Sequence, residues 1–88
     1  MDTLLRELFV WKRLGAGEAV RYVCFEDLST GRFCVQSADF YRLPVKPELL
    51  RQHERQAVEL FLEQSPLDRC EWHASVEAAI EAHDRHFA

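Results

Sequence analysis

Apolar and polar side chains alternate along residues 8–40 in a pattern that predicts three β-strands. Leu8–Leu14 is rich in β-branched and aromatic residues and ends at Gly15-Ala16-Gly17, where glycine tolerates the positive φ of a tight turn. Two further strands are predicted over Ala19–Glu26 and Arg32–Phe40, joined by the polar, glycine-closed segment Asp27–Gly31. Strands joined by such turns form a three-stranded antiparallel meander.

The start of the chain leaves one alternative open. Leu4, Leu5 and Leu8 lie at helical spacing, so Asp2–Phe9 could instead form a short helix. The opening residues, Met1–Arg6, lack the basic start and the long apolar stretch of a secretory signal. We therefore expect a cytoplasmic protein.

The register of the second hairpin depends on the length of its turn. A five-residue turn over Asp27–Gly31 places Cys24 opposite Cys34 and makes matched apolar pairs along the strands. A shift of one residue would pair Cys24 with Val35 instead. We expect the first of these registers.

The apolar spacing becomes helical after the proline-stiffened connector Leu43–Pro47. A helix is predicted over Pro47–Gln64, with Pro47 in its first turn, and a second helix is predicted to begin after an N-cap at Ser75. Pro66–Ala74 could extend a helix or supply a fourth short strand near Trp72, and the alternating residues there favour the strand. The apolar stripes of the two helices are Leu49, Leu50, His53, Ala57, Leu60 and Phe61, and Val76, Ala79, Ile80, His83 and Phe87.

The composition is that of one small folded domain. The chain has 88 residues, of which 48% are hydrophobic, 30% charged and 11% aromatic. These values exclude a disordered chain, and the length predicts a single domain over residues 1–88. No apolar run is long enough to cross a bilayer. Strands and helices in separate blocks predict an α+β fold.

Both faces of the predicted sheet are rich in apolar side chains. In the five-residue-turn register, one face carries Phe9, Trp11, Val23, Phe25, Phe33 and Val35, and the other carries Leu8, Val10, Leu14, Val20, Tyr22, Cys24, Cys34 and Ala38. Two helices on one side would leave the second face in water, which monomers rarely tolerate. We therefore expect a second copy of the chain, or another protein partner, to cover it, through a surface that includes Val10, Val20, Tyr22 and Arg32. The alternative is that the N-terminal segment or a helix covers the same face within one molecule.

The charge distribution bears on nucleic acid as a partner. The net charge is −4, and residues 47–88 hold four Lys or Arg against nine Asp or Glu. This acidic half would repel phosphate, so double-stranded nucleic acid is not expected to bind. A single-stranded nucleic acid could stack on the aromatic residues of the sheet if they faced solvent. We expect Trp11 opposite Arg21 to form a cation–π pair within the protein instead.

The cysteines raise the question of a metal. Cys24 and Cys34 would be neighbours across the hairpin, and Cys70 and His73 have Cys-x2-His spacing, so the four residues together could form a Cys3His set suited to zinc. The pairs of closely spaced cysteines that structural zinc sites use are missing from the sequence. Buried free thiols in a reducing compartment are the simpler interpretation, so no metal or other cofactor is expected.

The histidines do not form a recognisable catalytic motif. His83 and His86 are adjacent on one helical face and could hold a metal or transfer a proton, but His83 continues the apolar stripe. No serine or cysteine nucleophile has the neighbouring base that acyl transfer requires, and no phosphate-binding loop is present. We therefore expect a non-enzymatic interaction module that self-associates through its sheet. A small metal- or histidine-dependent enzyme and a single-strand nucleic-acid binder are the alternatives.

Overall fold

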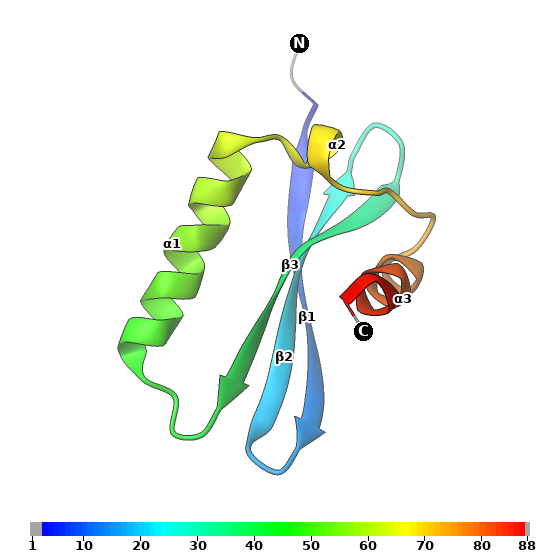
Figure 1. Cartoon of the computed structure of the whole chain (residues 1–88). Coiled ribbons are helices and arrows are strands. Elements are labelled where there is room, and N and C mark those ends of the chain that lie inside the picture. The colour runs from blue at the N-terminus through cyan, green and yellow to red at the C-terminus, as the bar shows by residue number, and fades with distance from the viewer. Residues whose placement is uncertain (1–2, 88) are drawn as a thin grey trace.

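A three-stranded antiparallel sheet forms the centre of the computed structural model, which describes residues 3–87 (Figure 1). The strands are β1 (Leu5–Gly15), β2 (Glu18–Asp27) and β3 (Arg32–Arg42), in the order β1-β2-β3. This confirms the α+β class and the meander. The N-terminal helix is wrong from Leu5 onward, because the chain there pairs with β2 instead; Met1 and Asp2 lie outside the described residues.

The first hairpin has the expected register. Trp11 pairs with Arg21, and the ladder is regular from Leu5 to Arg13, where an irregularity precedes the turn. Gly17 has a φ of 73°, a left-handed conformation that other residues rarely adopt.

The second hairpin is shifted by one residue from the preferred register. Asp27 pairs with Arg32, and Cys24 pairs with Val35. The cause is a shorter turn, because the Asp27 carboxylate accepts hydrogen bonds from the backbone N–H and the hydroxyl of Ser29, at 2.9 and 2.7 Å. These bonds hold Asp27 in the strand, and the turn has four residues between the paired positions. The shift moves Cys34 to the face that carries Phe25.

A β-bulge interrupts β3 at Gln36. The register changes between Val23 and Cys24, which pair with Ser37 and Val35, so Gln36 has no partner on β2. Its side chain is buried and reaches away from the ladder toward the helical segments. The bulge therefore adds a polar anchor at the outer edge of β3.

Within residues 3–87, three helices follow the sheet: α1 (Pro47–Glu63), α2 (Pro66–Arg69) and α3 (Val76–Phe87). Pro47 lies in the first turn of α1, as expected, and the Ser75 hydroxyl accepts a hydrogen bond from the N–H of Ala78 at 3.1 Å, which confirms the N-cap of α3. The undecided segment after α1 contains the single turn α2 and then an isolated β-bridge between His73 and Phe33.

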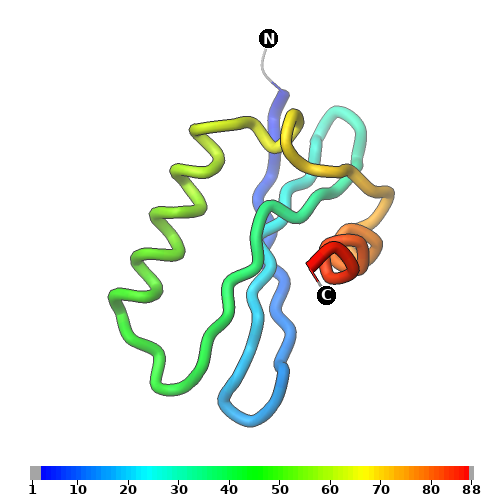
Figure 2. Tube along the Cα trace, viewed as in Figure 1, coloured from blue at the N-terminus to red at the C-terminus, as the bar shows by residue number. Residues whose placement is uncertain are grey.

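The two long helices lie on opposite sides of the sheet (Figures 1 and 2). One sheet face, here called the α3 face, carries the buried residues Val20, Tyr22 and Cys24, against which Val76 and Ile80 of α3 pack. The opposite face, here called the α1 face, carries Val23, Phe25 and Cys34, with Cys70 and Trp72 packed against them. Helices and the segment after α2 thus cover the centre of the sheet from both sides within one molecule.

Helix α1 packs less deeply than α3. None of its residues is buried, and it touches the sheet through ring contacts between Phe61 and Phe25 and between His53 and Tyr41, with centroids 5.2 and 5.1 Å apart. It lies beside β3 and leaves the β1 side of the α1 face uncovered (Figure 1).

Candidate functional site

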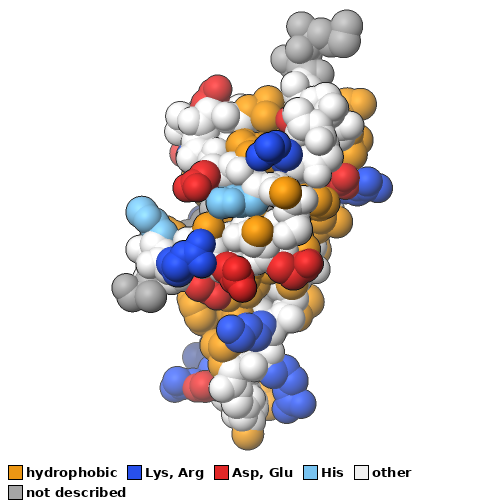
Figure 3. Space-filling model, turned by 90° about the vertical axis from the view of Figure 1, so that its right-hand side faces the viewer, with side chains coloured by type: hydrophobic (Ala, Val, Ile, Leu, Met, Phe, Trp, Pro, Cys, Tyr) orange, Lys and Arg blue, Asp and Glu red, His pale blue; other side chains and the backbone are white. Residues whose placement is uncertain are grey.

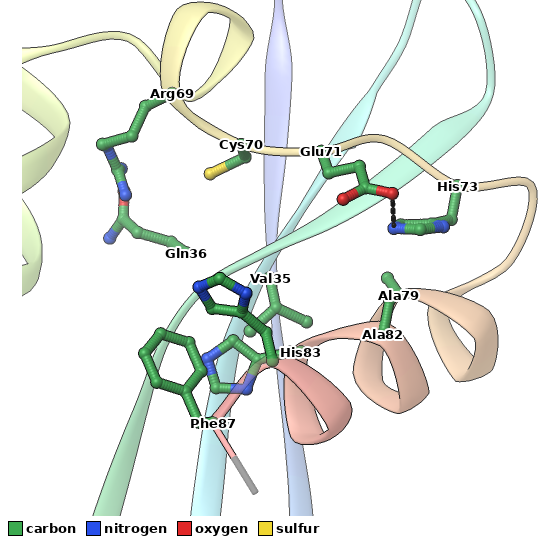
Figure 4. Close-up of a pocket in the computed structure, with 11 residues that line it drawn as sticks. Val35, Gln36, Arg69, Cys70, Glu71, His73, Ala79, Ala82, His83 and Phe87 are labelled. Carbon is green, nitrogen blue, oxygen red and sulfur yellow. Dashed lines mark hydrogen bonds and ion pairs between the residues drawn. The ribbon is translucent and has the colours of Figure 1, made fainter.

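A cavity of about 380 Å³ opens at the outer edge of β3, between the segment that follows α2 and helix α3 (Figure 4). Its lining brings together side chains from three segments of the chain. These are Val35, Gln36, Arg69, Cys70, Glu71, His73, Ala79, Ala82, His83, His86 and Phe87. Titratable groups are concentrated in this wall, which makes it the best-formed candidate site among residues 3–87.

Hydrogen bonds hold the α2 segment against β3. Phe33 and His73 exchange two backbone hydrogen bonds of 2.8 Å each. Arg69 donates to the side-chain oxygen of Gln36 at 3.0 Å, and the Gln36 amide donates to the carbonyl of Ala57 in α1 at 3.2 Å. The bulge residue therefore connects two helices, and Cys70 lies between the two anchor points on its segment.

Cys70 packs against the buried cluster that contains Cys34, and the two thiols affect each other's ionisation. The neighbouring Cys34 thiol and the positive charge of Arg69 favour the Cys70 thiolate and lower its pKa to about 7. The same contact, together with burial, raises the pKa of Cys34. Cys34 is fully buried, whereas Cys70 is partly exposed and its sulfur is directed into the cavity (Figure 4).

His73 and His83 lie in different parts of the cavity wall and have different neighbours. His83 stands in the middle of the cavity wall, and burial lowers its pKa although Asp84 opposes the shift. His73 lies 3.7 Å from the carboxylate of Glu71, at the other end of the cavity (Figure 4). No cysteine thiol forms a hydrogen bond with a histidine among residues 3–87.

The four metal candidates do not converge. Cys24 lies on the α3 face, while Cys34 and Cys70 meet on the other side of the sheet. Within the described part of the chain, no group of three or more His, Cys, Asp or Glu residues could hold a metal ion. The shifted register separates Cys24 from Cys34, since adjacent strand positions point to opposite faces.

The four interface candidates occupy different environments. Val20 and Tyr22 are 1% and 4% exposed beneath α3, and Val10 is half-buried at the border of the same cluster. Arg32 is exposed beside the β2–β3 turn and belongs to the other face. In this structure α3 covers the surface for which a second copy was expected. Figure 3 views the molecule from this side, with acidic side chains over α3 and basic ones toward the β1–β2 turn.

An aromatic surface remains exposed on the α1 face at β1. Phe9 and Trp11 are 51% and 56% exposed. The guanidinium of Arg21 lies over both rings, 4.8 and 5.6 Å from their centroids, which confirms the expected cation–π pair. Asp39 neutralises Arg21 at 3.3 Å. The charge of Arg21 is thus paired within the sheet, and the rings of Phe9 and Trp11 are exposed to solvent on the edge strand β1.

Sequence reasoning missed the Cys34–Cys70 contact and the linking role of Gln36. Both depend on the shifted register and the bulge, and neither has a local sequence signal. The sequence pattern places Phe9 and Trp11 on a face that helices should cover, but both rings are half exposed. They remain exposed because α1 packs beside β3 and does not reach β1.

Comparisons with known proteins found no matching family model, no similar curated protein and no similar solved structure. No helix within residues 3–87 combines the length and apolar character needed to span a bilayer. The class that can be stated is therefore the fold class: an α+β domain with a three-stranded meander between helices.

Proposed function

We propose that this protein is a non-enzymatic interaction module that self-associates, and that the second copy binds along the free edge of β1. The observation that carries the proposal is an edge strand of 11 residues with two half-exposed aromatic rings beside it. Long unprotected edges favour pairing with another strand, because their backbone N–H and C=O groups point outward.

The two edges of the sheet differ. The edge of β3 is partly occupied, because His73 bridges to Phe33 and the α2 segment lies along it. Among residues 3–87, β2 is the one strand that pairs with β1. Of the two edges, β1 therefore offers the longer run of backbone groups to a partner.

Charge complementarity favours a second copy as the occupant. In an antiparallel pair of β1 strands around a twofold axis at Val10, Glu7 of each copy opposes Arg13 of the other, and Phe9 opposes Trp11. All four side chains point to the α1 face, within the regular part of the strand. Opposite charges and aromatic rings are favourable cross-strand pairs, and each occurs twice in such a dimer.

Neighbouring registers lack this complementarity. An axis at Phe9 would oppose Arg6 to Lys12, which are both positive. An axis at Trp11 would bring no opposite charges together. An axis between two residues would set the outward-pointing backbone groups of one copy opposite inward-pointing groups of the other, so no ladder of hydrogen bonds could form. The sequence of β1 therefore favours one self-pairing register.

A charge-swap series tests this interface. Glu7 and Arg13 are both exposed, and neither forms an ion pair with another residue in the range 3–87. We expect Glu7→Arg and Arg13→Glu each to weaken dimerisation about tenfold, because like charges then meet twice across the interface. The double variant E7R/R13E restores the opposite pairs and should dimerise like the wild type. Sedimentation velocity from micromolar to near-millimolar concentration gives the dissociation constants.

Matched controls separate the interface from net charge. Glu63→Arg and Arg51→Glu make the same charge changes at exposed positions of α1 and should leave the dissociation constant unchanged. A wild-type chain that stays monomeric over the whole range would overturn the proposal, and so would a double variant no better than the single ones.

A cytoplasmic location belongs to the same proposal. All three cysteines are free thiols, as in proteins of reducing compartments. The cytoplasmic location would be contradicted if the native chain were found in an exported fraction with its cysteines in disulfide bonds.

A further inference from the structure

We propose that Cys34 and Cys70 form a reversible redox pair, in which Cys70 reacts first with a hydroperoxide and Cys34 then closes an intramolecular disulfide. The pair is distinct from the free edge of β1, because Cys34 lies on β3, at the opposite edge of the sheet. It goes beyond self-association and assigns a modification site to the cavity.

The geometry places two thiols with unequal access. Cys34 projects from β3 and is 0% exposed, and Cys70 packs against the cluster that contains it. Cys70 lines the cavity of about 380 Å³ and directs its sulfur into it (Figure 4). A small oxidant can therefore reach Cys70 and not Cys34, which defines an attacking and a resolving cysteine.

The surroundings keep the two sulfurs close. The exchanged hydrogen bonds between Phe33 and His73 fix one side of the segment, and the bond from Arg69 to Gln36 fixes the other. Both anchors lie within three residues of Cys70 and within two of Cys34. These anchors therefore hold the segment that carries Cys70 against the strand that carries Cys34.

The electrostatics favour the reactive form of Cys70. The neighbouring Cys34 thiol lowers the pKa of the Cys70 thiol, and so does the positive charge of the adjacent Arg69. The thiolate is the nucleophile in reactions with peroxides. Cys24, in contrast, is buried on the α3 face, and burial raises its pKa to about 11. The same chain therefore contains an unreactive cysteine for comparison.

The reaction balances with a hydroperoxide as oxidant. The Cys70 thiolate attacks the terminal peroxide oxygen, the O–O bond breaks, and the departing alkoxide or hydroxide takes a proton, which leaves a sulfenic acid on Cys70. The Cys34 sulfur then attacks the Cys70 sulfur, and the displaced hydroxide takes the Cys34 proton and leaves as water. Two thiols lose two electrons and two protons in total, and the peroxide is reduced to one alcohol or water plus one water.

The test treats the full-length wild-type protein with hydrogen peroxide and maps its peptides under non-reducing conditions. We expect a peptide that links Cys34 to Cys70, a mass lower by two hydrogen atoms, and full reversal by a dithiol reductant. Cys24→Ser should behave identically. In Cys34→Ser, the sulfenic acid on Cys70 should persist and be captured by a cyclic dione, and in Cys70→Ser no linkage should form.

A second measurement does not depend on the folding of any variant. In the native wild-type protein, alkylation of Cys70 by iodoacetamide at neutral pH should exceed that of Cys24 by at least about 100-fold, since thiolate fraction and access both favour Cys70. Its rate should rise through pH 7. Three outcomes would each overturn the proposal. Cys24 could be alkylated as fast as Cys70, the disulfide could form between two chains, or Cys70 of the wild type could be oxidised further without linkage to Cys34.

Discussion

Tyr22 shows how single side chains attach α3 to the sheet. Its hydroxyl donates to the carboxylate of Asp84, with oxygen–oxygen distances of 2.9 and 3.1 Å, and its ring meets that of His83 edge-on at 6.0 Å. Burial and the neighbouring carboxylate raise the pKa of Tyr22 to about 12. The sequence pattern marked this residue as an interface residue, and in the structure its partner is a helix of the same chain.

Substitutions at Tyr22 test this attachment. We expect Tyr22→Phe to lower the free energy of unfolding by about 1 kcal/mol, because one hydrogen bond to a half-exposed carboxylate is lost. Tyr22→Glu would bring a second carboxylate against Asp84 in a buried position and should cost about 3 kcal/mol or more. Urea denaturation followed by circular dichroism measures both values. Equal stability of the two variants would show that α3 does not cover Tyr22.

At the scale of elements, the bulge at Gln36 organises the packing of the helices. Helix α1 has no buried residue, so its position depends on a small number of contacts, and the bond from Gln36 to Ala57 is one of them. The oxygen of the same amide accepts from Arg69 and holds the α2 segment. The helices themselves were predictable from proline, the apolar stripe and the Ser75 cap, because these signals are local. The bulge was not, because it depends on which strand pairs with which.

Two substitutions at Gln36 separate its two bonds. Gln36→Glu keeps an acceptor for Arg69 and loses the donor to Ala57, whereas Gln36→Leu loses both. We expect faster amide hydrogen exchange in α1 for both variants, and faster exchange around Cys70 for the leucine variant alone. The leucine variant should lose about 1–3 kcal/mol of stability, because it leaves the partly buried guanidinium of Arg69 without this acceptor. Unchanged exchange in α1 in both variants would contradict the anchoring role of Gln36.

For the whole molecule, the buried thiols and Tyr22 link stability to pH. The pKa of Cys24 is raised from 9.0 to about 11 and that of Tyr22 from 10.0 to about 12, while that of Cys70 is lowered from 9.0 to about 7. A group with a raised pKa keeps its proton in the folded state after the unfolded chain has lost it, so its contribution to stability is lost as pH rises. Cys70 acts in the opposite sense, because its contribution is present above pH 9 and is lost as pH falls toward 7.

We therefore expect stability to rise slightly between about pH 7 and pH 9, and then to fall as the unfolded chain loses the protons of Cys24, Cys34 and Tyr22. The loss due to Cys24 alone should be on the order of 2 kcal/mol by pH 11. Urea midpoints measured across this range under reducing conditions give the profile. Cys70→Ser should abolish the rise and keep the fall, and a flat profile above pH 9 would contradict the burial of these groups.

The sequence by itself determined the elements of this protein. Alternation, glycine turns, proline positions and caps act over a few residues, so these local signals are enough to predict the meander and both long helices. The tertiary structure alone decided the rest. The carboxylate of Asp27 shortened one turn, and the shift of one residue transferred Cys34 to the α1 face, where it meets Cys70. Helix α3 then covered the face on which a second molecule was expected, because register and helix placement depend on contacts between residues that are distant along the chain.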